Sequence, residues 1–160
     1  MATEQEMADT LRMALLEDGI DLSHSRIAEI VARQMGEGAT GIRFPRCCPV
    51  FRMFDDAKAR EFYCDFLGFR LLFEHRFAPA APLYMGVECG GFALHLSEHH
   101  GDATPGSTAF VETKDIRAFH SDLLGKRYRF NRPGLEELSW GLQMEVVDPF
   151  GNRIRFCERT

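Results

Sequence analysis

The chain has 160 residues, of which 45% are hydrophobic and 27% are charged, and its formal net charge is −5. This length and balance fit one globular domain with a small appendage. No apolar run approaches the ~20 residues that cross a bilayer, and the polar start MATEQEMADT does not resemble a signal peptide. Neither a membrane nor a nucleic acid is expected as a partner, since no basic stretch is present to neutralise phosphates.

The cysteines indicate a reducing compartment. There are five, which is an odd number, Cys47 and Cys48 are adjacent, and no C-x-x-C motif occurs. A disulfide framework or a zinc ribbon would need paired, spaced cysteines. We therefore expect free thiols and a cytoplasmic location.

Residues 4 to 35 are predicted to form two helices, the first ending at Gly19 and the second capped by Ser23 or Ser25. Such a pair should dock on the remainder of the chain or on a second subunit, where it could mediate a protein interaction. A DNA-reading helix pair is disfavoured by the acidic charge. The segment GEGATG (36–41) is predicted to be a flexible joint, which divides the chain into an N-terminal helical extension (1–40) and a main domain (41–160). The apolar stripes of the helices are Met7, Leu11, Ala14 and Leu15, and then Ile27, Ile30, Val31 and Met35.

The main domain begins with a strand in PVFRMF (49–54) and a helix in DDAKAREFYCDFLGF (55–69). Asp55 or Asp56 can cap this helix, and Gly68 ends it. A strand over 69–73 follows, and then a hairpin in which PLYMGVE and FALHLSE flank the turn Gly90-Gly91. The apolar face of the helix is predicted to consist of Ala59, Phe62, Tyr63 and Phe66.

The same order then recurs. STAFVET (107–113) is predicted to be a strand, KDIRAFHSDLLGK (114–126) a helix ending at Gly125, and YRF (128–130) the start of another strand. LQMEVV, the turn DPFGN and RIRF complete the second half, in which Gly125 is expected to play the part of Gly68. The pattern predicts an α+β fold made of tandem βαβββ units, with the N-terminal helical pair added.

A tandem βαβββ unit with FYCDFLGF in its first half and DPFGNRIRF in its second resembles the vicinal oxygen chelate superfamily. That superfamily includes glyoxalase I, extradiol dioxygenases, and fosfomycin- and bleomycin-resistance proteins. The stretch PLYMGVECGGFALHLSEHHGDATPGST is most similar to the bleomycin-resistance branch. The resemblance implies a curled mixed sheet around a cleft. For this branch it also implies a homodimer that binds a cationic glycopeptide antibiotic without chemistry, in grooves between the subunits.

In the metalloenzymes of the superfamily, the first and last strands of each half supply metal ligands. The equivalent positions here are Cys48, His95, Thr108 and Arg155. Thr108 is a poor ligand and the permanent charge of Arg155 repels a divalent cation, so we expect no metal and no other cofactor. A metal-dependent lyase or dioxygenase remains the alternative function and would need other ligands. His95, His99 and His100 are close enough in sequence for a separate metal site.

Strand alternation predicts which side chains face the cleft. These ligand-binding candidates are His95, Ser97, Thr108, Phe110, Glu112, Glu145, Arg153 and Arg155, with Phe54 and Trp140 at the rim. Two interpretations are open: an internal network in which Glu112 or Glu145 pairs with Arg155, or a groove that binds a large, partly aromatic molecule. Trp140 could equally well belong to the core. The predicted function is binding and sequestration of a bleomycin-type antibiotic, without catalysis.

Overall fold

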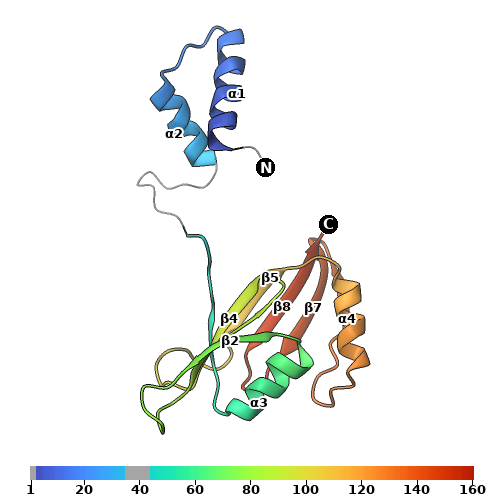
Figure 1. The fold of residues 1–160 in the computed structure, drawn as a ribbon. Coiled ribbons are helices and arrows are strands. Elements are labelled where there is room, and N and C mark those ends of the chain that lie inside the picture. Colours follow the sequence, from blue (N-terminus) through green and yellow to red (C-terminus); the bar gives the residue numbers. More distant parts are fainter. Residues whose placement is uncertain (1–2, 35–43) are drawn as a thin grey trace. The chain divides into compact units, whose positions relative to one another are not determined.

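The structure is a computed structural model that describes residues 3–34 and 44–160 (Figure 1). The chain divides into two compact units, Met1–Arg46 and Cys47–Thr160, which are described separately below. The predicted joint over 36–41, and with it the predicted domain boundary after residue 40, lies outside the described residues, as does Met35.

The first unit is the predicted pair of helices, α1 (Glu4–Glu17) and α2 (His24–Gln34). Thr3 starts α1 with a reciprocal cap: its hydroxyl accepts from the Glu6 N–H at 3.3 Å, and the Glu6 carboxylate accepts from the Thr3 N–H at 2.7 Å. Gly19, with φ +77°, takes the left-handed conformation that ends the helix. Ser23 precedes α2, and its hydroxyl accepts from the N–H of Arg26 at 3.4 Å.

A small core joins α1 to α2. Ile27 and Val31 are buried as predicted, but the first helix contributes Ala8, whereas Ala14 is exposed. The buried face of α1 is therefore rotated slightly about the helix axis from the predicted face. The sequence does not determine this rotation, because α1 has more apolar residues than two helices can bury. The partly buried side chains around this core are Met7, Leu11 and Leu22.

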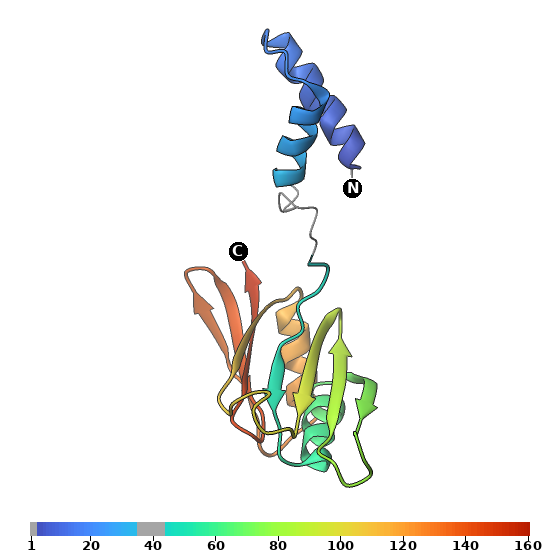
Figure 2. The same cartoon turned by 90° about the vertical axis from the view of Figure 1, so that its left-hand side faces the viewer.

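The second unit confirms the tandem repeat (Figures 1 and 2). Asp55 caps the helix of the first repeat by accepting from the N–H of Lys58 at 2.9 Å. That helix changes from α to π hydrogen bonding after one turn. The first repeat consists of β1 (Val50–Arg52), α3 (Asp56–Arg60), η1 (Glu61–Phe66), β2 (Arg70–His75), β3 (Tyr84–Cys89) and β4 (Phe92–Ser97). The second consists of β5 (Thr108–Glu112), α4 (Ile116–Gly125), β6 (Leu135–Leu138), β7 (Gly141–Val147) and β8 (Arg153–Arg159).

Each repeat makes its own four-stranded mixed sheet, in the order β1-β4-β3-β2 and β5-β8-β7-β6. In each sheet the first and last strands along the chain are adjacent and parallel: β1 with β4, and β5 with β8. One side of both sheets packs on the helices in a single hydrophobic core that contains the predicted helix face. The opposite side carries no helix of this unit, and Figure 2 looks onto it with the helices behind the strands. We call it the open side. The buried strand residues include Leu94 and Leu96 in the first sheet, and Met144, Val146, Ile154 and Phe156 in the second.

A buried polar network connects the two repeats. The hydroxyl of Tyr63 in η1 donates to the Asp148 carboxylate at 2.8 Å. The same carboxylate accepts from the side-chain amide of Asn152 at 2.7 Å, and this amide also donates to the carbonyl of Arg52 at 2.8 Å. The turn DPFGN between β7 and β8 is therefore anchored to the first repeat through its first and last residues.

One prediction about the residues after α4 is wrong, and one about its end is right only in part: α4 ends at Gly125 as predicted, but without the conformation of Gly68. Residues 128–130 are not a strand, because Tyr128 stacks on Phe66 with ring centroids 4.6 Å apart and the chain continues without pairing until β6. Gly125 does not act as Gly68 does: it is the last residue of α4, and the left-handed residue is Arg127, at φ 52°. Gly68, with φ +79°, does end the helix formed by α3 and η1.

Candidate functional site

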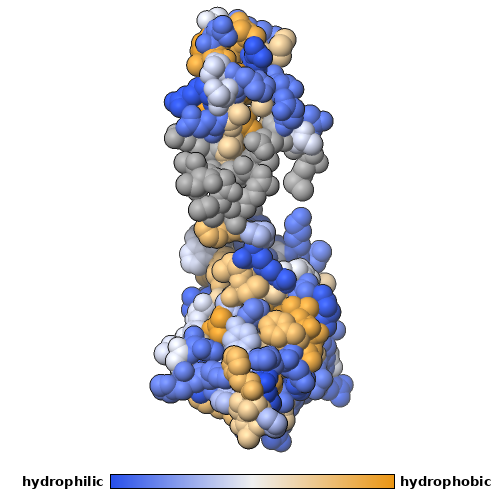
Figure 3. All heavy atoms as spheres, turned by 60° about the vertical axis from the view of Figure 1, so that its left-hand side comes forward, coloured by the Kyte–Doolittle hydropathy of each residue, from blue (hydrophilic) through white to orange (hydrophobic). Residues whose placement is uncertain are grey.

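The open side of the second sheet gathers most of the predicted cleft residues. In the strand register, Arg155 of β8 lies between Phe110 of β5 and Glu145 of β7, and Arg153 lies beside Thr108. The alternate residues of these strands are in the core, so the predicted faces of β5, β7 and β8 agree with the structure. Figure 3, viewed obliquely from this side, shows hydrophobic side chains in separate groups among hydrophilic ones.

A shallow hollow of about 500 Å³ lies on this side of the sheet. Two aromatic side chains border it, Phe110 and Trp140, with 47% and 48% of their surface exposed. Trp140 is thus at the surface and not in the core. Half-exposed aromatic rings next to hydrogen-bond donors can stack on a planar ligand. The remaining lining residues are Gln143, Arg155 and Arg159.

Ion pairs hold the arginines around the hollow in place. The Nε of Arg155 donates to Glu145 at 2.8 Å, and Arg153 approaches the same carboxylate at 3.7 Å. Arg159 donates to Glu112 at 2.7 Å, and its guanidinium lies 5.7 Å from the ring centre of Phe110. The predicted pairing of Arg155 is therefore with Glu145, and Glu112 pairs with Arg159. Since these bonds use the Nε atoms, the terminal N–H groups of both arginines are oriented but not consumed by them.

The open side of the first sheet carries an aromatic group around His95. Its Nδ1 is 2.9 Å from the hydroxyl of Tyr84, and the ring of Phe73 meets His95 edge-on at 5.3 Å. Phe73 reaches this position because residue 86, opposite His95 in the register, is glycine: a Cβ there would overlap the Phe73 ring. Phe73 and Tyr84 stack on one another at 6.2 Å.

The environment of Tyr84 favours its neutral form. Burial raises its pKa above the ordinary value, and electrostatic interaction with Asp102 raises it further. A phenol that keeps its proton at neutral pH can donate to the Nδ1 of His95.

Two other predicted residues lie apart from these groups. Ser97 is on the same face as His95 but is fully buried, and its hydroxyl donates to Asp102 at 2.6 Å and accepts from the N–H of His99 at 3.0 Å. Phe54 is exposed beyond the end of β1, with Phe150 edge-on at 6.0 Å and Arg52 over its ring at 4.8 Å. Ser97 thus organises a loop, and Phe54 lies at the DPFGN turn.

The residues at the metal positions of the superfamily do not fit a divalent ion. His95 is engaged with Tyr84, and Arg155 brings a positive charge that Glu145 already balances. Among residues 3–34 and 44–160, no group of three or more His, Cys, Asp or Glu side chains is arranged to hold a metal. This includes the predicted alternative around His99 and His100. All five cysteines are free.

Sequence reasoning missed several residues of the two open sides. Phe73 and Tyr84 were not predicted because no faces were assigned to β2 and β3. The signal was available in β3, where the apolar Met85 and Val87 of the core alternate with Tyr84 and Gly86. Arg159 escaped because the alternation of Arg153 and Arg155 was not followed to the end of β8. In both cases the period of two was present in the sequence.

Comparison with known proteins agrees with this architecture. A sequence family described as "Glyoxalase superfamily protein" matches residues 32–160. The chain belongs to the glyoxalase superfamily. A search of curated proteins finds no match to it. Within the part of the chain that the structure describes, no helix has the length and apolar character needed to cross a membrane.

Solved structures similar to this glyoxalase superfamily protein include antibiotic-binding proteins. The bleomycin-binding protein of Streptomyces verticillus, in complex with copper(II)-bleomycin, is 24% identical with a TM-score of 0.57, covering 74% of this chain and 99% of that one. TnmS3, an antibiotic-binding protein from Streptomyces sp. CB03234, is 22% identical with a TM-score of 0.56, covering 74% and 100%. A putative glyoxalase family protein from Bacillus anthracis is 17% identical with a TM-score of 0.52, covering 74% and 99%. These similarities establish the fold.

Proposed function

We propose that this protein binds and sequesters a bleomycin-type antibiotic, or a molecule of similar size and polarity, without chemical conversion. The observation that carries the proposal is the hollow in which Phe110 and Trp140 expose half of their surface beside oriented arginine donors. Exposed aromatic rings on a rigid sheet lose little conformational entropy on binding, which suits a flat surface for stacking. The resemblance to antibiotic-binding proteins in fold supports the same function.

The carboxylates of Glu112 and Glu145 on this surface are already paired with arginines. Glu112 holds Arg159 and Glu145 holds Arg155, so a cationic drug must compete with an arginine for either carboxylate. The competition is feasible because such exposed pairs contribute only about 0–1 kcal/mol. The net charge of −5 additionally favours the approach of a cation.

A groove requires a second wall. The hollow is shallow and open, and it lies on one sheet, while the aromatic group around His95 lies on the other. We propose that a second copy of the chain covers the open sides, so that a cytoplasmic homodimer encloses the ligand between its subunits. Burying Trp140 and Phe110 in this way would remove apolar surface from water.

The test is a titration of metal-free and copper-loaded bleomycin into the purified protein, followed by heat and by the fluorescence of the single tryptophan. Saturable binding that leaves the drug unmodified supports sequestration, and Phe110→Ala should weaken it about threefold to tenfold. Phe77→Ala, which removes an exposed ring from outside the hollow, is the matched control. Absence of binding to both forms of the drug would refute the proposal that the protein sequesters bleomycin.

The dimer and the enzyme alternative each need a separate measurement. Sedimentation velocity with and without drug reports whether two chains share the ligand. The metal content of protein purified without chelator tests the metal-dependent lyase or dioxygenase, because a stoichiometric metal would require ligands other than Cys48, His95, Thr108 and Arg155.

A further inference from the structure

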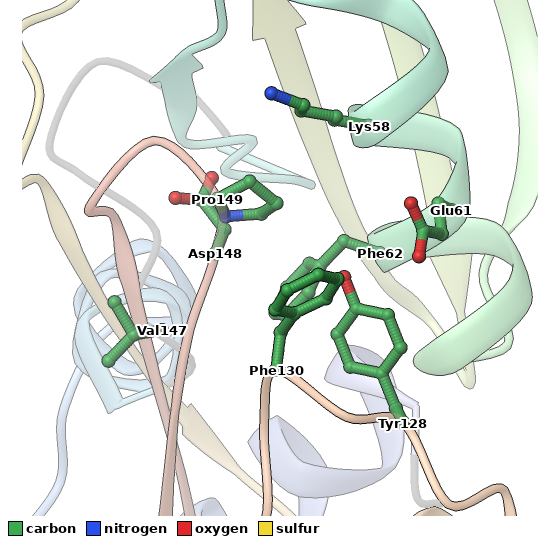
Figure 4. A pocket seen from close by; sticks show the side chains of 8 residues that line it. All are labelled: Lys58, Glu61, Phe62, Tyr128, Phe130, Val147, Asp148 and Pro149. Atoms are coloured by element: carbon green, nitrogen blue, oxygen red, sulfur yellow. The ribbon is translucent and has the colours of Figure 1, made fainter.

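A second cavity, of about 310 Å³, lies between the helix formed by α3 and η1, the segment after α4 and the end of β7 (Figure 4). None of its lining residues borders the hollow around Trp140. The superfamily resemblance assigns nothing to it. The residues that line it are Lys58, Glu61, Phe62, Tyr128, Phe130, Val147, Asp148 and Pro149.

The apolar wall of this cavity is aromatic and mostly fixed in position. Phe62 is buried, and Tyr128 is held against it at 6.2 Å while stacking on Phe66. Phe130 meets Tyr128 edge-on at 5.6 Å, and the guanidinium of Arg129 covers its ring at 4.2 Å. Phe130 nevertheless exposes 64% of its surface. The wall can therefore receive an aromatic ring on a scaffold that is already ordered.

The two exposed charged groups at the mouth of the cavity belong to the continuous helix formed by α3 and η1. Lys58 and Glu61, three residues apart, project above the aromatic side chains in Figure 4. Such a spacing commonly allows an ion pair, yet within the described residues these two do not pair with each other or with any other charged side chain. The deeper Asp148 carboxylate is occupied by Tyr63, Asn152 and the N–H of Phe150. The mouth thus offers one ammonium and one carboxylate beside an aromatic wall.

We propose that this cavity is a second small-molecule site, specific for an aromatic zwitterion with the layout of an aromatic α-amino acid. The ring packs against Phe130 and Tyr128, the ligand carboxylate meets Lys58, and the ligand ammonium meets Glu61. The volume is at the lower end of the range for ligand sites, which limits the ligand to about one or two rings. A ligand with a single charge would leave one of the two mouth residues unsatisfied and repelled.

The probe is 4-fluoro-L-phenylalanine, followed by ¹⁹F NMR line broadening on the full-length protein. A ligand of this size is expected to bind with a dissociation constant of about 1 mM. Two analogues each lack one charge: 4-fluorophenethylamine and 3-(4-fluorophenyl)propanoate. Each should bind about twofold to fivefold more weakly, the range for one exposed charge pair. Equal binding of all three compounds would overturn the assignment of the two charges.

Three variants locate the probe. Phe130→Ala should abolish detectable binding, and Lys58→Gln and Glu61→Gln should each weaken it about twofold to fivefold. All three residues are exposed, so these variants are expected to fold, which thermal unfolding checks. Phe77→Ala is the control and should bind as the wild type does. No binding at 10 mM (about tenfold above the expected constant), or binding that Phe130→Ala leaves unchanged, would overturn the proposal, whatever the result with bleomycin.

Discussion

Tyr63 of the first repeat donates a hydrogen bond of 2.8 Å to Asp148 of the second, although 85 residues separate them in sequence. Both residues are buried, and burial raises the pKa of Tyr63 well above its ordinary value. The phenol therefore stays protonated at neutral pH and keeps the proton that it donates to Asp148. This contact fixes the helix of one repeat against the turn that joins the last two strands of the other.

Removing this hydroxyl should destabilise the protein. Tyr63→Phe keeps the ring but takes one donor from a buried carboxylate, which costs about 1.5–3 kcal/mol for a hydrogen bond to a charged group. Urea unfolding measures the change. Tyr128→Phe is the control, because the Tyr128 hydroxyl makes no hydrogen bond within the described residues, and its free energy of unfolding should change by less than about 0.5 kcal/mol. A similar loss in both variants would mean that the hydrogen bond to Asp148 contributes nothing specific.

The Asp148 carboxyl should make stability depend on pH. Burial raises its pKa above 3.8, and this effect outweighs the hydrogen bonds from Asn152, Tyr63 and Phe150 that lower it. Because the folded protein binds this proton more tightly than the unfolded chain, the resulting stability is fully present below about pH 4 and is lost as the pH rises through the folded-state value. Asp148→Asn removes this pH-dependent contribution to stability. It also replaces one accepting carboxylate oxygen by an NH₂ group that faces hydrogen-bond donors, at a cost of about 1–3 kcal/mol.

The measurement compares unfolding of the wild type and Asp148→Asn between about pH 7 and pH 4. The stability advantage of the wild type over the variant should increase as the pH falls. A constant difference over this range would show that the pKa of Asp148 is the same in the folded and unfolded states.

Gly86 makes room for the aromatic group of the first sheet. In Gly86→Ala the new methyl group would overlap the ring of Phe73, and moving that half-exposed ring should cost about 1 kcal/mol. In a Phe73→Ala background the same change should be nearly neutral, so a double-mutant cycle should give a coupling of about 1 kcal/mol. Gly141→Ala is the contrast. Gly141 has φ +148°, and a methyl group there would overlap the backbone carbonyl of Glu158. No shortening of a neighbouring side chain can relieve this overlap. Additive costs at Gly86 and Phe73 would contradict the contact.

Glu145 should influence binding more than folding. Its carboxylate holds Arg155 at 2.8 Å and Arg153 at 3.7 Å, and all three side chains are between 36% and 49% exposed. Glu145→Gln should therefore change the free energy of unfolding by less than about 1 kcal/mol. It leaves the hollow more positive, so the affinity for a cationic drug should fall severalfold, and more at low salt than at high salt. Asp65→Asn, which removes an exposed charge from η1 that makes no ion pair within the described residues, is the charge-matched control.

Local patterns were enough to predict the order of elements. The helix face of Phe62 and Tyr63, the Gly90-Gly91 hairpin and the alternation of Arg153 and Arg155 each follow from a period of 3.6 or 2 within a few residues. The same periods predicted which side of β5, β7 and β8 faces the core. They failed where the deciding contact is distant: residues 128–130 resemble a strand but pack on Phe66, which lies in the other repeat.

The sequence by itself thus determined the repeat, the core side of β4, β5, β7 and β8 and, through its motifs, the superfamily. Only the tertiary structure decided that Arg155 pairs with Glu145 and Arg159 with Glu112, that Trp140 lies at the surface, and that Tyr63 joins Asp148. Backbone periodicity is set by neighbours in the chain, so it is present in any window of a few residues. Ion pairs, exposed rings and buried hydrogen bonds depend on which segments meet in space, and that is settled only when the two repeats close on one core.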